Sequence, residues 1–155
     1  MSHNDIAFYL ETARKTEAFS GDEILVLDEV LRGCFDAPGR DYTLIDAEEC
    51  GTSGGFLIFG PTPMTAFAWD LYWIVVDPSH QRKGVGLALD RGMCAAILSR
   101  SDRAVIRVET AGRSDYDGQR HFYERAAYRE CGRIPNFYSE GDDLVLYCKE
   151  IRRLP

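Results

Sequence analysis

The chain has 155 residues, a length typical of one domain with a single core, so we predict one domain over residues 1–155. Its 45% hydrophobic and 28% charged residues are typical of a soluble globular protein. No apolar run reaches the roughly 20 residues that cross a bilayer, so no membrane partner is expected. A net charge of −7 argues against a general nucleic-acid binder.

The targeting and cysteine patterns favour a cytoplasmic protein. The N-terminus lacks a basic region followed by a long apolar one, so we expect no signal peptide. The five cysteines are odd in number and none forms a Cys-x-x-Cys pair, which favours free thiols over a disulfide framework or a structural zinc site. The three histidines lack metal-ligand spacing, so no metal is expected.

Hydrophobic periodicity predicts an α+β domain. A Ser20–Glu23 capping-box pair, followed by apolar residues at helical intervals, predicts a helix over 19–35 that ends at a glycine near its last turn. The nearly continuous apolar run 69–76 predicts a central strand, and 103–109 alternates with period two. The other predicted elements are strands 5–11, 42–49, 54–60, 128–134 and 142–151, and helices 85–99 and 117–127. This order predicts a mixed sheet with helices on its faces and a right-handed crossover into 103–109.

A basic, glycine-containing turn follows the strand predicted at 69–76. Gly84 and Gly86 open the next predicted helix, where free N–H groups and the helix dipole favour an anion and a missing Cβ permits its close approach. Arg82 and Lys83 add positive charge beside them. The turn suits a phosphate or pyrophosphate, but neither the P-loop nor the dinucleotide fingerprint fits it. A purely structural turn with solvated cations is the alternative.

The pattern Gln81-x-x-Gly84-x-Gly86 resembles the acetyl-CoA-binding motif of the GNAT superfamily of N-acetyltransferases. The segment "HFYERAAY", residues 121–128, resembles a later helix of that family, and the element order matches over residues 5–151. The resemblance implies a mixed, mostly antiparallel sheet of about six to seven strands with helices on both faces. It also implies that the parallel fourth and fifth strands splay apart and admit the pantetheine arm of the coenzyme.

The same resemblance implies acetyl-CoA as cosubstrate, held by the strand end, the glycine turn and the later helix. The implied contact residues are Ile74, Val75, Val76, Gln81, Arg82, Lys83, Gly84, Val85, Gly86, Leu87, Tyr116 and Tyr123. A backbone N–H near Val75 or Val76 is the expected oxyanion donor. Two positions depart from the family pattern: Ala127 replaces a Gly, and Tyr116 replaces an Asn. In the family, that Asn makes a hydrogen bond to the pantetheine arm, which Tyr116 or Ser114 would have to supply here.

Acetyl transfer to an amine needs a base and a proton donor for the leaving thiolate. A phenol can protonate a thiolate, and the resemblance puts Tyr123 beside the coenzyme sulfur. Asp70 is the closest match to a catalytic Glu of the family, and Glu109, at the end of the parallel neighbour strand, is the second candidate base. For either carboxylate, the alternative is a solvated charge with no catalytic role. Tyr72, which we expect on one face with Asp70 and Ile74, is a candidate to orient the amine or relay its proton.

The acceptor amine is not specified by the sequence. In the family, residues equivalent to 12–40 and to the loop between the last strands select it. In that loop Tyr138, Glu140, Asp142 and Asp143 either receive a cation or form an ordinary turn. Two functions stay open: an enzyme that moves acetyl from acetyl-CoA to a primary amine in a ternary complex, and a non-catalytic acyl-CoA-binding sensor or partner module. Edge strands also permit a homodimer.

Overall fold

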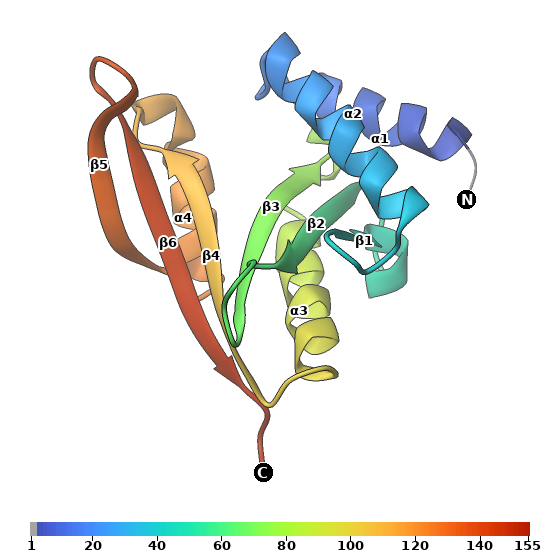
Figure 1. Ribbon diagram of the computed structural model, residues 1–155. Coiled ribbons are helices and arrows are strands. Elements are labelled where there is room, and N and C mark those ends of the chain that lie inside the picture. The colour runs from blue at the N-terminus through green and yellow to red at the C-terminus, as the bar shows by residue number, and fades with distance from the viewer. Residues whose placement is uncertain (1–2) are drawn as a thin grey trace.

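A six-stranded mixed sheet forms the centre of the computed structural model, which describes residues 3–155 (Figure 1). The strand order is β1-β2-β3-β4-β6-β5, and the only parallel neighbours within the described chain are β3 and β4. The strands are β1 (Thr43–Asp46), β2 (Gly55–Pro61), β3 (Ala68–Val76), β4 (Arg103–Ala111), β5 (Arg129–Ser139) and β6 (Asp142–Arg152). The predicted mixed, mostly antiparallel sheet is confirmed.

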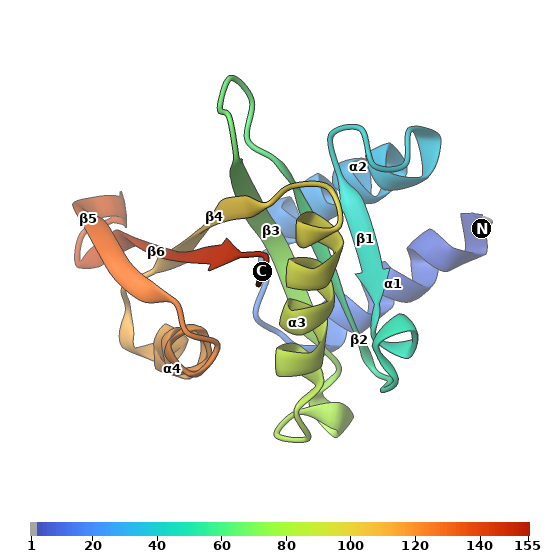
Figure 2. The same ribbon diagram turned by 90° about the horizontal axis from the view of Figure 1, so that it is seen from below.

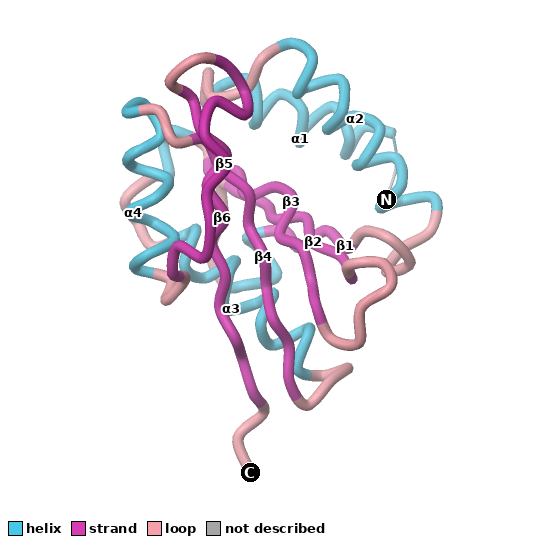
Figure 3. Tube along the Cα trace, turned by 60° about the vertical axis from the view of Figure 1, so that its left-hand side comes forward, coloured by secondary structure: helices cyan, strands magenta, loops and turns pink. Residues whose placement is uncertain are grey.

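Four α-helices cover the two faces of this sheet. They are α1 (His3–Lys15), α2 (Gly21–Asp36), α3 (Val85–Leu98) and α4 (Asp117–Arg125). Helices α1 and α2 pack on the first face of β2 and β3, around Phe56, Ile58 and Val75. Helix α3 packs on the second face, where α4 covers β4 and β6 (Figures 2 and 3). We call these the α1/α2 face and the α3/α4 face.

The strand predicted at 5–11 is wrong, because these residues belong to α1. Ile6, Tyr9 and Ala13 are buried at helical spacing, and the Tyr9 hydroxyl donates a hydrogen bond to Asp46 at 2.9 Å. A seven-residue apolar stretch suits either a strand or a helix, and packing against α2 decided the outcome here.

The capping box of α2 is confirmed, since the Ser20 side chain accepts from the Glu23 N–H and Glu23 accepts from the Ser20 N–H. Gly33 does not end the helix, which continues to Asp36. A Cβ at Gly33 would lie 3.1 Å from the ring of Tyr42, so a larger residue there would crowd this ring.

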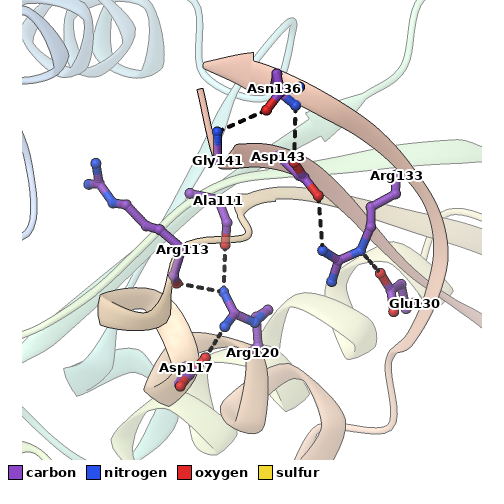
Figure 4. A network of polar contacts seen from close by, with 9 residues as sticks. All are labelled: Ala111, Arg113, Asp117, Arg120, Glu130, Arg133, Asn136, Gly141 and Asp143. Atoms are coloured by element: carbon purple, nitrogen blue, oxygen red, sulfur yellow. Dashed lines mark hydrogen bonds and ion pairs between the residues drawn. The ribbon is translucent and has the colours of Figure 1, made fainter. Parts of the chain in front are cut away.

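The predicted loop between the last two strands is mostly strand. β5 extends to Ser139, so the turn itself is confined to two residues (Figure 3). Asp143 accepts hydrogen bonds from the Asn136 N–H and from Arg133, while the Asn136 side chain accepts from the Gly141 N–H (Figure 4). These contacts support the turn interpretation for Asp143.

The prediction of five free thiols is also wrong. Cys131 and Cys148 form a disulfide, and the free cysteines are Cys34, Cys50 and Cys94. The pair lies across the β5–β6 ladder, where the register shifts between Glu130 and Gly132. A separation of 17 residues along the chain does not reveal that two side chains face each other across a hairpin.

Among residues 3–155, no helix is long and apolar enough to cross a membrane. The same residues contain no group of three or more His, Cys, Asp or Glu side chains suited to a metal ion.

Candidate active site

The parallel strands β3 and β4 pair over only a short stretch. Ala68–Asp70 lie beside Val105–Arg107, and no pairing continues beyond them (Figure 1). A bulge follows on β3, because Ile58 faces Trp73 and the next β2 residue faces Leu71, which leaves Tyr72 without a partner in the β2 ladder. A bulge bends and twists its strand, so the two parallel strands diverge from this point.

The bulge also changes which side chains share a face of β3. Asp70 and Tyr72 lie on the α1/α2 face, where the ring centroids of Tyr72 and Tyr42 are 5.3 Å apart. Ile74 instead packs against the core under α3. The prediction that Asp70, Tyr72 and Ile74 share one face is therefore wrong, since an extra residue reverses the alternation.

A cavity of about 730 Å³ opens where the strands diverge, and we call it the splay cavity. Its volume lies within the roughly 300–1,000 Å³ of small-molecule sites. The lining comes from the α1–α2 connection, the end of β3, the glycine turn and α4: Thr16, Ala18, Phe19, Ile74, Val75, Val76, His80, Gln81, Arg82, Gly84, Val85, Gly86, Leu87, Asp115, Gly118, Gln119, His121, Phe122, Tyr123 and Arg125. The structure thus brings together all the predicted coenzyme residues except Lys83 and Tyr116, which are not among the lining residues.

The glycine turn presents backbone to this cavity. Gly84 has a φ of +79°, and a Cβ there would meet nothing within 4 Å. No side chain caps the start of α3, which leaves its first N–H groups available to an anion. A Cβ at Gly86 would lie 2.9 Å from the ring of Phe122, so this glycine lets α3 and α4 approach closely. Gln81 donates a hydrogen bond to the Val76 carbonyl at 3.2 Å and ties the turn to β3.

Tyr123 is 6% exposed and lies in an aromatic cluster. Its ring centroid is 5.4 Å from that of Phe122 and 5.7 Å from those of Tyr128 and Tyr147. Burial, aided by the negative charge of Asp90, raises the pKa of the Tyr123 phenol. The phenol therefore stays protonated at neutral pH and retains a proton to donate.

Tyr116 does not line the splay cavity, but it contacts Ala18, which does. Its hydroxyl donates to the Ala18 carbonyl at 3.3 Å, a contact between segments 98 residues apart in the chain. The Arg113 guanidinium lies 4.6 Å from the centre of the Tyr116 ring. The Tyr116 side chain thus joins the β4–α4 connection to the α1–α2 connection.

The two candidate bases have different surroundings. Asp70 is 7% exposed and accepts hydrogen bonds from Arg107 at 2.6 Å, Thr62 at 2.7 Å and Tyr72 at 3.5 Å. Burial and the charge of Asp70 raise the pKa of Tyr72. Glu109 is exposed and lies two residues past Arg107, the last β4 residue paired with β3. Asp70 therefore lies in the hydrogen-bonded part of the β3–β4 pair, and Glu109 lies beyond it, where the two strands have diverged.

Sequence reasoning missed several residues around this site. The period-two pattern of 103–109 does not reveal the contact between Arg107 and Asp70, which depends on the register between β3 and β4. Thr16, Ala18 and Phe19 reach the cavity from within residues 12–40, the segment that the resemblance associates with the acceptor, but no motif singled them out. The capping residue Ser20 marked the end of that connection.

The comparisons with known proteins agree with this fold. The description "Acetyltransferase (GNAT) family" matches residues 8–128, most of the chain, and the protein belongs to this acetyltransferase family. A GNAT-family protein of known structure from Desulfovibrio desulfuricans is 28% identical with a TM-score of 0.86, and the alignment covers 96% of this chain and 94% of that one. The sequence matches none of the curated proteins with which it was compared.

Two solved structures with specific activities share the fold at lower identity. An aminoglycoside 6'-N-acetyltransferase complexed with coenzyme A is 17% identical with a TM-score of 0.75, over 99% of this chain and 94% of that one. The ribosomal-protein-S18-alanine N-acetyltransferase of Escherichia coli is 19% identical with a TM-score of 0.69, over 100% and 93%. At these identities the likeness concerns the fold alone.

Proposed function

We propose that the protein is an N-acetyltransferase that moves the acetyl group of acetyl-CoA to a primary amine by direct attack in a ternary complex. One observation carries this proposal: the splay cavity is lined both by an uncapped helix start with a glycine turn and by the buried Tyr123. The helix start with its glycine turn suits a pyrophosphate, and Tyr123 suits a leaving thiolate. The coenzyme A complex of a protein with the same fold adds support.

The backbone of β3 offers donors to the coenzyme. The Asp77 N–H donates a hydrogen bond to the Gly54 carbonyl at 2.7 Å, so these two residues form a hydrogen-bonded pair of the antiparallel β2–β3 ladder. Because bonded and non-bonded pairs alternate, the N–H groups of Ile74 and Val76 point away from β2, toward the gap left by β4. We assign the thioester oxyanion to one of these N–H groups, and Val75, whose N–H faces β2, is not a donor.

The acid and base follow from exposure and position. Glu109 takes a proton from the acceptor ammonium, directly or through water, and the free amine attacks the thioester carbonyl carbon. The carbon–sulfur bond of the tetrahedral intermediate then breaks, and the thiolate takes the proton of Tyr123. The acylated nitrogen loses its second proton to solvent as the amide forms, and solvent returns a proton to the Tyr123 phenolate. Asp70, engaged by Arg107, Thr62 and Tyr72, supports the closed end of the strand pair instead of accepting the amine proton.

Calorimetric titration with acetyl-CoA, coenzyme A and ATP tests whether the protein binds the coenzyme. We expect saturable binding of both coenzyme A compounds, much tighter than ATP. An amine panel of kanamycin, spermidine and an alanine-terminated hexapeptide, read by thiol release, then tests transfer. Equal binding of ATP would contradict the pantetheine site, and tight coenzyme binding without transfer to any amine would favour a non-catalytic sensor.

Replacement of Tyr123 by Phe separates its chemical role from its packing role. The ring stays in the aromatic cluster while the donor is lost, so we expect turnover to fall by about 10²-fold or more. Coenzyme affinity should change by less than about twofold, since the cavity keeps its shape. Unchanged turnover in this variant would exclude Tyr123 as the proton donor.

A further inference from the structure

Arg120 is a largely buried cation at the start of α4, with a side chain 13% exposed. Its guanidinium donates to the Ala111 carbonyl at 2.8 Å, to the Arg113 carbonyl at 3.0 Å and to the carboxylate of Asp117 (Figure 4). A buried charge is costly unless it is paired and hydrogen-bonded, and here three acceptors surround it. They lie at the end of β4 (Ala111), in the β4–α4 connection (Arg113) and at the start of α4 (Asp117).

The acceptors and the donor lie next to the two proposed catalytic groups. Ala111 is the last residue of β4, two positions beyond Glu109. Arg120 lies three positions before Tyr123 on α4, so the two side chains are neighbours on one face of the helix. A single guanidinium therefore joins the strand of the proposed base to the helix of the proposed acid.

The start of α4 lacks a side-chain cap, although the Tyr116 hydroxyl donates to the Ala18 carbonyl. The helix has nine residues, and its N-cap residue Tyr116 makes no side-chain capping bond. A helix this short is marginal by itself, so tertiary contacts must hold it in place. Arg120 does not line the splay cavity, which separates its contacts from coenzyme binding.

We propose that Arg120 is a positioning residue for acetyl transfer, which sets the location of the Tyr123 hydroxyl relative to the Glu109 carboxylate. This inference rests on the proposed function. A displacement of about 1 Å can lower a rate by about 10²-fold, whereas the glycine turn proposed to hold the pyrophosphate lies at the start of α3 and not on α4. The role therefore predicts a loss in kcat with little change in coenzyme affinity.

Three variants test the role: Arg120→Met, Arg120→Lys and the control Arg153→Met. Arg153 also donates to a backbone carbonyl, that of Leu98, and pairs with a carboxylate, that of Asp102, but it lies at the C-terminal end of the chain. We expect Arg120→Met to lower kcat by about 10- to 100-fold with coenzyme affinity within about twofold of wild type. The kcat of Arg120→Lys should lie between those of Arg120→Met and the wild type, because the lysine ammonium cannot reproduce the planar set of N–H donors of the guanidinium. Arg153→Met should keep the wild-type kcat.

The readouts are kcat and KM with the best acceptor of the amine panel, coenzyme affinity by calorimetry, and hydrogen exchange of residues 117–125. Faster exchange confined to α4, together with the selective kcat loss, supports the proposal. If Arg120→Met does not fold, Arg120→Lys decides, and wild-type kcat in that variant overturns the positioning role. A wild-type protein that acetylates no panel amine instead overturns the proposed function on which this inference rests.

Discussion

The Arg107 Nε atom lies 2.6 Å from Asp70 Oδ1, and this ion pair joins β3 to β4 at the last residues where they pair. The carboxylate raises the pKa of the Arg107 guanidinium, which stays charged. An aspartate that already accepts from a cation and two hydroxyl groups has little remaining capacity to take a proton from an amine. The same pair marks the point from which the strands separate.

The first prediction concerns the identity of the base. Glu109→Gln should lower kcat by about 10²-fold or more, because the amide cannot accept a proton. Asp70→Asn should lower kcat by less than about tenfold and destabilise the fold by about 1–2 kcal/mol, since Arg107 is half exposed and solvent compensates part of the loss. Steady-state kinetics and urea unfolding of both variants measure these effects. A larger loss of kcat in Asp70→Asn than in Glu109→Gln would instead identify Asp70 as the base.

The second prediction tests the anion site with a matched pair. Gly84 has a left-handed φ that Asn and Asp tolerate best among other residues, and a Cβ there meets no neighbour. Gly84→Asn and Gly84→Asp should therefore fold alike and differ only in charge. We expect the Asp variant to bind coenzyme A about tenfold more weakly than the Asn variant at low salt, because its carboxylate would lie near the pyrophosphate. Equal affinities in a calorimetric titration would argue against a pyrophosphate at this turn.

The third prediction concerns a buried ion pair that links α3 to β6. Lys149 Nζ lies 2.6 Å from Asp90 Oδ2, and the Tyr128 hydroxyl donates to the other oxygen at 2.8 Å. Asp90→Asn should lower the free energy of unfolding by about 3–5 kcal/mol, because the buried Lys149 side chain would lose its carboxylate partner. Asp90→Leu combined with Lys149→Met should recover most of this loss.

Urea unfolding measures the third prediction, with Glu150→Gln as its control. Glu150 pairs with Arg103 at 3.0 Å at the surface, so that substitution should cost less than about 1 kcal/mol. Similar losses at Asp90 and Glu150 would show that burial of the Lys149 pair carries no special penalty.

The fourth prediction concerns alkaline stability. Burial raises the pKa of Tyr9, Tyr123 and Tyr128, and hydrogen bonds to carboxylates add to the effect at Tyr9 and Tyr128. A raised folded-state pKa means that the unfolded chain loses these protons first. The stabilisation is therefore complete below about pH 10 and declines as the pH rises further, by about 1.4 kcal/mol per pH unit for each phenol.

Tyr128→Phe removes one of these phenols and tests the fourth prediction. Between about pH 10 and 11, its unfolding free energy should fall less steeply than that of the wild type, by about 1.4 kcal/mol per pH unit. The two proteins are compared by urea unfolding at several pH values. Parallel curves would mean that the Tyr128 hydroxyl ionises alike in both states.

Local signals in the sequence were sufficient for most elements and for much of the site. The capping box at Ser20 and the alternation in 103–109 depend on neighbours within a few residues, and both are confirmed. The glycine motif from Gln81 to Gly86 located the turn that lines the splay cavity. A motif of this kind encodes backbone geometry, which is local and can be read from the chain.

Tertiary structure alone decided the features that depend on strand register and on packing between distant segments. The bulge at Tyr72 reversed the faces of β3, the β3–β4 register gave Asp70 its partner Arg107, and the hairpin joined Cys131 to Cys148. Residues 5–11 became helix because packing against α2 outweighed a short apolar pattern. The sequence by itself thus determined the family resemblance and the position of the glycine turn, since both depend on consecutive residues. Which carboxylate faces the opening between the strands depends on contacts between residues far apart in the chain, which only the folded sheet brings together.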